Sequence, residues 1–166
     1  ISTDKIGSVI SKEIENRGFV PIVNLSGHSI EQYNLHAGIT IPNINDGRGV
    51  ILKEGLYAVE PFVTNGVGKV KEGGPSGIYE LKNDRNPRSP MAREVLQFIK
   101  KEYNKLPFCS RWIVKALGSK ALFGLKELES NNIVYQFPQL VEVSGAKVSQ
   151  NENTFLIDKD GKKELL

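Results

Sequence analysis

The two histidines of the chain, His28 and His36, lie eight residues apart in the stretch NLSGHSIEQYNLHAG. In a regular strand this even spacing would place both side chains on one face, whereas a helix would set them about 80° apart. Gly27 and Gly38 flank the pair and favour loop ends. The stretch is therefore a candidate for a reaction centre, and two loop histidines with local hydrogen bonds are the alternative.

Two glutamates interrupt sequence that otherwise has the texture of buried strands. Glu60 lies within LYAVEPFV, and Glu152 lies within SQNENTFLI. A carboxylate in such a place loses hydration, which is tolerable when it meets a cation, a hydrogen-bond donor or a metal ion. Capping by nearby backbone N–H groups is the alternative for Glu60. One imidazole and two carboxylates suit a first-row divalent ion, but nothing in the composition brings them together in space.

The elements that must position these residues follow from periodicity. Ile6, Val9, Ile10 and Ile14 predict an amphipathic helix that ends near Gly18. Segments 19–25, 37–43 and 55–64 predict strands of one sheet. Helices are expected at 90–103, 110–117 and 119–128, followed by a hairpin of 138–143 with 146–157 and a turn at 160–161.

Composition narrows the class of protein. The chain has 166 residues, 39% of them apolar, and no apolar run approaches the ~20 residues of a membrane span. The N-terminus lacks the pattern of a secretory signal, so the cytoplasm and no membrane partner are expected. The single Cys109 excludes an internal disulfide framework and a thiolate metal site and is expected to be a buried thiol. A net charge of +3 gives little case for a nucleic-acid site.

Two competing motifs fail on their spacing. GVGKVKEGG lacks the Walker pattern and is expected to be a turn. Ser26 and Ser29 lie beside His28 without a nucleophile-elbow pattern, which disfavours a serine hydrolase. The chain begins at Ile1 rather than Met and already reads as a helix there, so we expect a piece of a longer polypeptide.

Five motifs in order, VNLSGHSIEQYNLHAGITIPN, EGLYAVEPFVTNGVGKV, LPFCSRW, YQFPQLVEV and VSQNENTFLI, resemble the type II methionine aminopeptidases, especially the archaeal branch. The resemblance runs from about 6 to 157. It implies the C-terminal part of an α+β pita-bread fold with a small all-helical insertion. The expected divisions are 1–83 and 136–166 for the catalytic domain and 84–135 for the insertion.

The resemblance also implies a ligand set and a reaction. Two divalent ions (Co, Mn, Fe or Zn) would be held by five ligands, of which His28, Glu60 and Glu152 lie in this chain. Two aspartates, together with a further histidine, would precede Ile1. The ions would activate a water that hydrolyses the bond after an initiator methionine, and Glu60 would also act catalytically by moving a proton to the leaving amine.

Substrate contacts and partners are implied in the same way. His36 would touch substrate and steady the tetrahedral intermediate, while Leu35 and Phe137 would line the methionine side-chain pocket. The substrates would be nascent polypeptide N-termini, with the ribosome as a further partner and a monomer as the complete form. With three of five ligands, the isolated chain is expected neither to hold a dinuclear centre nor to cleave Met-Gly peptides.

Three residues depart from the family pattern. Glu31 replaces a usual glycine, and Asn151 and Asn153 replace the aromatic residue and the histidine around the bridging carboxylate. The latter two changes are expected to weaken metal affinity or activity. The alternative function is a catalytically inactive relative that binds a ribosome, RNA or protein, but such relatives lose ligands that this chain keeps. A prolidase-type dipeptidase is disfavoured by the helical insertion.

Overall fold

The computed structural model describes all residues, Ile1–Leu166, and divides them into two compact units. The first unit joins Ile1–Glu72 to Leu140–Leu166, and the second is Gly73–Gln139. The strands β6 (Val70–Leu81) and β8 (Val134–Glu142) cross the boundary. The three segments expected from the sequence stay a prediction of domain organisation, because compactness alone does not establish an independent domain.

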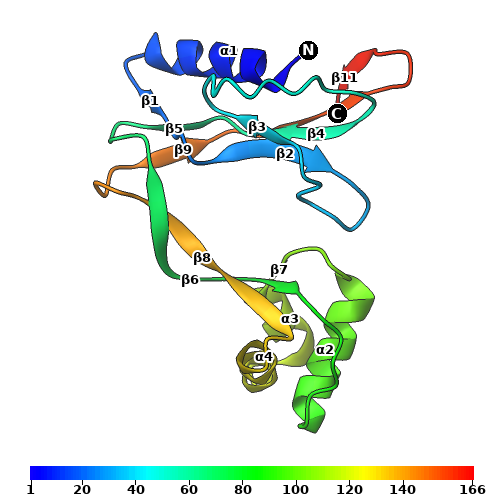
Figure 1. Ribbon diagram of the computed structural model, residues 1–166. Helices are drawn as coiled ribbons and strands as arrows, with labels where there is room; N and C mark the ends of the chain where they lie inside the picture. Colours follow the sequence, from blue (N-terminus) through cyan, green and yellow to red (C-terminus); the bar gives the residue numbers. More distant parts are fainter. The chain divides into compact units, whose positions relative to one another are not determined.

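The first unit contains two sheets rather than the single sheet predicted from the sequence (Figure 1). The larger has the order β11-β10-β4-β2-β3, with every neighbouring pair antiparallel. Its strands are β2 (Ser26–Ile30), β3 (Thr40–Pro42), β4 (Gly55–Val59), β10 (Asn153–Ile157) and β11 (Lys163–Leu165). The smaller, β1-β5-β9, joins β1 (Val20–Pro21), β5 (Phe62–Thr64) and β9 (Val148–Gln150).

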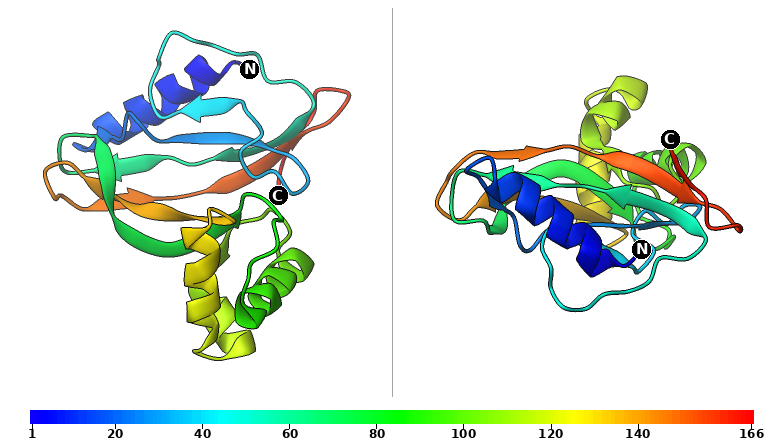
Figure 2. Two further views of the ribbon diagram at one scale, coloured as in Figure 1. Left: turned by 60° about the horizontal axis from the view of Figure 1, so that its bottom comes forward. Right: turned by 90° about the horizontal axis from the view of Figure 1, so that it is seen from above.

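The helix α1 (Thr3–Glu15) packs against the larger sheet near β3 (Figure 2). Its closest approach is at Gly7, where an added Cβ would lie 2.1 Å from the carbonyl oxygen of Ile44. The predicted helix is confirmed, but the inclusion of Val9 in its buried face is wrong, since Val9 is 70% exposed. The close backbone approach turns the helix so that Thr3, Gly7 and Ile14 face inward.

Strand β4 pairs with β10 and strand β5 pairs with β9, and a short unpaired gap separates the two paired regions. The last pair on one side is Val59 with Asn153, and the first pair on the other side is Phe62 with Gln150. The segments 59–62 and 150–153, which cross the gap, are equally long, so the pairing register is the same on both sides. Pro61 lies in this gap and has no N–H to continue the ladder. The single predicted strand 55–64 is therefore two strands.

The connection after β8 is organised by the buried side chain of Glu142, which is 3% exposed. One carboxylate oxygen accepts the N–H of Val67 at 2.8 Å, and the other accepts the N–H and hydroxyl of Ser144 and the N–H of Ala146. These bonds, led by that from the Ser144 hydroxyl, lower the pKa of Glu142 to about 2.

The predicted hairpin of 138–143 with 146–157 is wrong. The strand β8 neighbours β6, whereas β9 pairs with β5. The turn at Ser144–Gly145 is present, with the Gly145 N–H bonded to the carbonyl of Glu142. Because the Glu142 carboxylate ties this turn to Val67, the chain leaves β8 without folding back along it. The turn predicted at 160–161 is confirmed by the hairpin of β10 with β11.

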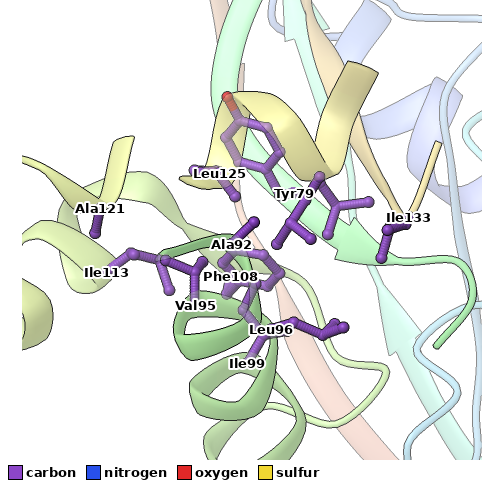
Figure 3. Packing of buried hydrophobic residues seen from close by; sticks show 12 residues of the cluster. Tyr79, Ala92, Val95, Leu96, Ile99, Phe108, Ile113, Ala121, Leu125 and Ile133 are labelled. Carbon is purple, nitrogen blue, oxygen red and sulfur yellow. The ribbon is translucent and has the colours of Figure 1, made fainter. Parts of the chain in front are cut away.

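The second unit carries all three predicted helices and its own apolar core. The helices are α2 (Pro90–Glu102), α3 (Ser110–Leu117) and α4 (Ala121–Ser130), accompanied by the strand order β7-β6-β8 with β7 (Phe108–Cys109). The Ser89 hydroxyl caps α2 by accepting the N–H of Ala92. Leu96, Ile113 and Leu125 are fully buried in this core (Figure 3). None of the four helices has the length and apolar character of a transmembrane span.

Replacing Glu142 by glutamine should remove a pH-dependent part of the stability. A carboxyl whose pKa is lowered on folding stabilises the protein above its unfolded pKa, and this contribution is lost as the pH falls toward about 2. We expect Glu142→Gln to lower the Tm at pH 7 and to flatten the fall in Tm between pH 4.5 and pH 2. Thermal unfolding followed by circular dichroism measures both effects. Glu54→Gln, at an exposed site, is the control; equal curves for Glu142→Gln and wild type would contradict the assignment.

Two leucines of α4 provide a matched test of the second core. Leu128 is fully buried, whereas Leu122 is 45% exposed. We expect Leu128→Ala to lower the free energy of unfolding by ~3 kcal/mol through lost burial and a cavity, and Leu122→Ala by less than about 1 kcal/mol. Urea titrations followed by the fluorescence of Trp112, the single tryptophan, measure both values. Equal losses would show that α4 packs differently.

Candidate metal centre

His28 lies in the middle of β2, in the interior of the larger sheet. It pairs with Thr40 of β3 on one side and with Ala58 of β4 on the other. The preceding residue, Gly27, allows this close packing, since a Cβ there would lie 2.2 Å from the carbonyl oxygen of Ala58. The glycine that suggested a loop end from sequence is therefore a strand residue that lets the backbones of β2 and β4 approach.

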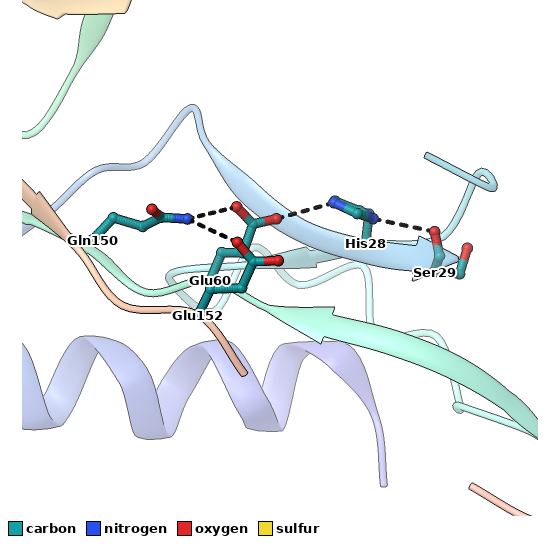
Figure 4. Close-up of polar contacts among 5 residues, drawn as sticks. All are labelled: His28, Ser29, Glu60, Gln150 and Glu152. Carbon is teal, nitrogen blue, oxygen red and sulfur yellow. Dashed lines mark hydrogen bonds and ion pairs between the residues drawn. The ribbon is translucent and has the colours of Figure 1, made fainter. Parts of the chain in front are cut away.

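The ring of His28 is oriented by a hydrogen bond on each nitrogen. Its Nδ1 lies 3.2 Å from the carbonyl oxygen of Ser29 and donates a proton to it, since a carbonyl can only accept. Its Nε2 lies 3.0 Å from Oε1 of Glu60, and both side chains are largely buried, at 9% and 13% exposed (Figure 4). A backbone carbonyl that holds Nδ1–H and leaves Nε2 toward the site is the usual support of a histidine ligand.

Glu60 and Glu152 approach each other from the gap shared by the two broken strands (Figure 4). The side-chain nitrogen of Gln150 lies 2.9 Å from Oε2 of Glu60 and 3.3 Å from Oε2 of Glu152. One amide therefore joins the two carboxylates. Gln150 was not among the site residues predicted from the sequence, although the two-residue period of a strand places it on the same face as Glu152.

The pKa of the Glu60 carboxyl is raised above its ordinary value. Burial is the main cause, and the charge of Glu152 adds to it. The charge of His28 and the hydrogen bonds from Gln150 and His28 act in the opposite direction. Glu60 is thus a carboxyl that holds a proton more readily than an exposed one.

His36 meets His28 edge to face, with 4.4 Å between the ring centroids. It lies in the loop between β2 and β3, which begins with a turn that joins Glu31 to Asn34 through two backbone hydrogen bonds. A cavity of about 290 Å³ is lined by both histidines and by neighbouring residues such as Asn24, Ser26, Ile39 and Thr40.

The two other predicted substrate contacts, Leu35 and Phe137, belong to different units of the chain. Leu35 precedes His36 in the same loop but does not line that cavity. Phe137 is in β8 within the second unit, where its ring packs edge to face against Tyr135. Their roles in a methionine pocket stay predictions.

The donor atoms fit a divalent cation in kind but do not complete a site. An imidazole nitrogen and two carboxylates are ligands that first-row ions accept. The supported ring of His28 and the repulsion between Glu60 and Glu152 both favour a cation between them. However, no group of three or more His, Cys, Asp or Glu side chains is positioned to hold a metal ion as it stands.

The chain is similar in sequence to curated proteins of one family. The chain is 45% identical over 164 residues to the methionine aminopeptidase of Thermococcus onnurineus, and 43% identical over 162 residues to that of Archaeoglobus fulgidus. Each alignment covers 97% of this chain. The chain is a relative of the methionine aminopeptidases. It spans about half the length of these relatives, 56% and 54%. No protein-family model matches it.

Solved structures confirm the expected fold class. A structure of a thermophilic Arx1 has a TM-score of 0.73 at 20% identity and covers 95% of this chain and 44% of its own. The methionine aminopeptidase of Thermotoga maritima has a TM-score of 0.53 at 20% identity and covers 99% of this chain and 42% of its own. The fold is the α+β pita-bread fold of the methionine aminopeptidases.

The close contact at Gly27 gives a test of how the fold places His28. We expect Gly27→Ala to lower the free energy of unfolding by about 1–3 kcal/mol, because the methyl group would force β2 away from the Ala58 carbonyl. Gly74→Ala is the matched control, since a Cβ there meets open space. Chemical denaturation measures both values. An unchanged stability for Gly27→Ala would mean that the two strands are further apart than described.

Proposed function

We propose that the protein containing this chain removes the N-terminal methionine from polypeptides by metal-assisted hydrolysis. The observation that carries the proposal is the contact of His28 with Glu60, and of Glu60 with Glu152 through Gln150. These residues are far apart in sequence, and they are the ones that the resemblance to type II methionine aminopeptidases implies as ligands. The family relationship supports the same reading.

We assign His28, Glu60 and Glu152 as ligands to two divalent ions. When bound, the ions supply Lewis acidity and a water of lowered pKa. His28 offers Nε2, since its Nδ1 proton is held by the Ser29 carbonyl. Glu60 would also move a proton to the leaving amine during hydrolysis.

His36 is the proposed contact to the substrate. Its ring lies against that of His28 at the edge of the cavity that both histidines line. An imidazole can donate a hydrogen bond to the carbonyl oxygen of a scissile bond, where negative charge develops during attack, and this is the role we assign to His36. The substrates proposed are N-termini of nascent chains that begin with methionine.

The family relatives are about twice as long as this chain, so two proteins test the proposal. The first is the 166-residue chain, and the second is the chain joined to the remaining part of the Thermococcus onnurineus enzyme, which it resembles at 45% identity. We expect the first to release no methionine from a Met-Gly peptide with Co²⁺ or Mn²⁺, because two ligands are missing, and the second to release it.

The ligand assignment predicts the behaviour of variants of the joined protein. His28→Ala should lower kcat/KM by at least about a hundredfold and lower the number of Co²⁺ ions bound, since a directly bound group matters more than the groups that support it. Tyr33→Ala, at an exposed position of the loop that follows β2, should leave both unchanged. Release of methionine by the 166-residue chain would contradict the proposal that its metal site is incomplete. A folded but inactive joined protein would contradict the function.

A further inference from the structure

Gln150 makes an unusual pair of hydrogen bonds, because one side-chain nitrogen faces two carboxylates. The distances are 2.9 Å to Glu60 and 3.3 Å to Glu152, and both bonds end on the Oε2 atom. A primary amide has two N–H groups, so each carboxylate can receive its own hydrogen. The amide oxygen could not take this position, since it would face two like charges.

The other oxygen of Glu60 has a different partner. Oε1 contacts Nε2 of His28 at 3.0 Å, while Oε2 contacts Gln150. The Glu60 carboxylate is therefore fixed from two sides, by a largely buried imidazole and by an exposed amide. Glu152 has no comparable support from the imidazole, so its contact with Gln150 is what ties it to Glu60.

The Gln150 amide offsets the repulsion between the carboxylates of Glu60 and Glu152. Glu60 and Glu152 carry like charges, and the side-chain nitrogen of Gln150 lies within hydrogen-bond distance of both. Gln150 is the last residue of β9 and pairs with Phe62 across the ladder, so its backbone is fixed beside the gap from which both glutamates project.

We propose that Gln150 is a positioning residue, whose amide holds the carboxylates of Glu60 and Glu152 together when no cation lies between them. The proposal rests on the proposed function, because it gives the two glutamates a common task as ligands. It adds a residue that is itself not a ligand. A site held together in this way needs less rearrangement when a divalent ion arrives, so its affinity for the ion is higher.

A double-mutant cycle tests the contact without any metal. Gln150→Ala is introduced into the wild type and into the Glu60→Gln, Glu152→Gln background, and the Tm of each protein is measured. We expect Gln150→Ala to lower the Tm of the wild type by about 2 °C and to change that of the neutral background by less than about 0.5 °C. Gln139→Ala is the matched control, since Gln139 is exposed and donates to a neutral carbonyl, that of Pro75.

A role of Gln150 confined to strand β9 would give the same Tm loss in both backgrounds, and this result would overturn the proposal. Titration calorimetry with Co²⁺ is the second readout, in the joined protein described above. We expect Gln150→Ala to weaken the Kd by about tenfold and Gln139→Ala to leave it unchanged. An unchanged Kd for Gln150→Ala would also overturn the proposal. Tm coupling without Co²⁺ binding by any variant would support the amide contact and count against the proposed function.

Discussion

The site depends on keeping two like charges close together. Glu60 and Glu152 come from the gap between two paired regions, which a single backbone hydrogen bond crosses, from the N–H of Asn151 to the carbonyl of Pro61. Their repulsion and the burial of Glu60 would separate them unless positive or proton-donating groups stood nearby. His28 and Gln150 provide those groups from opposite sides. His28 is fixed by the pairing of β2 in the larger sheet, and Gln150 by the pairing of β9 in the smaller one. The geometry of the carboxylates is therefore a property of the fold rather than of a flexible loop.

The sequence predicted the helices better than the sheets. The helical spacing of apolar residues and the Ser89 cap placed α2 within a residue of its observed ends, because both signals are local. The strand β6 was missed, since its glycines look like a turn and its pairing with β7 and β8 joins distant segments. The same reason explains the wrong partner given to 146–157. Pairing is decided by the Glu142 carboxylate and by neighbouring strands, which no local pattern encodes.

For the candidate site, the sequence identified the chemistry but not its arrangement. His28 was selected as one of the two histidines of the chain, and Glu60 and Glu152 because they interrupt strand-like segments; the structure brings His28 to Glu60. The sequence did not predict the contact between the two histidines. Their even spacing fits one face of a single strand, but His28 lies on β2 and His36 on the loop after it. Gln150 was missed because glutamine in an exposed strand has no distinctive signature. Its importance comes from the two carboxylates around it.

The shared gap also couples the lengths of two distant segments. Val59 to Phe62 and Gln150 to Asn153 cross it in equal steps, so the paired register on both sides is the same. Loss of a single residue from one segment would shift every side chain beyond it to the opposite face of its strand. Loss of one residue from both segments at once would keep the two registers matched. A change of length in one segment alone is therefore costly, even though both segments lie at an interruption of the sheet, where loops usually tolerate insertions and deletions.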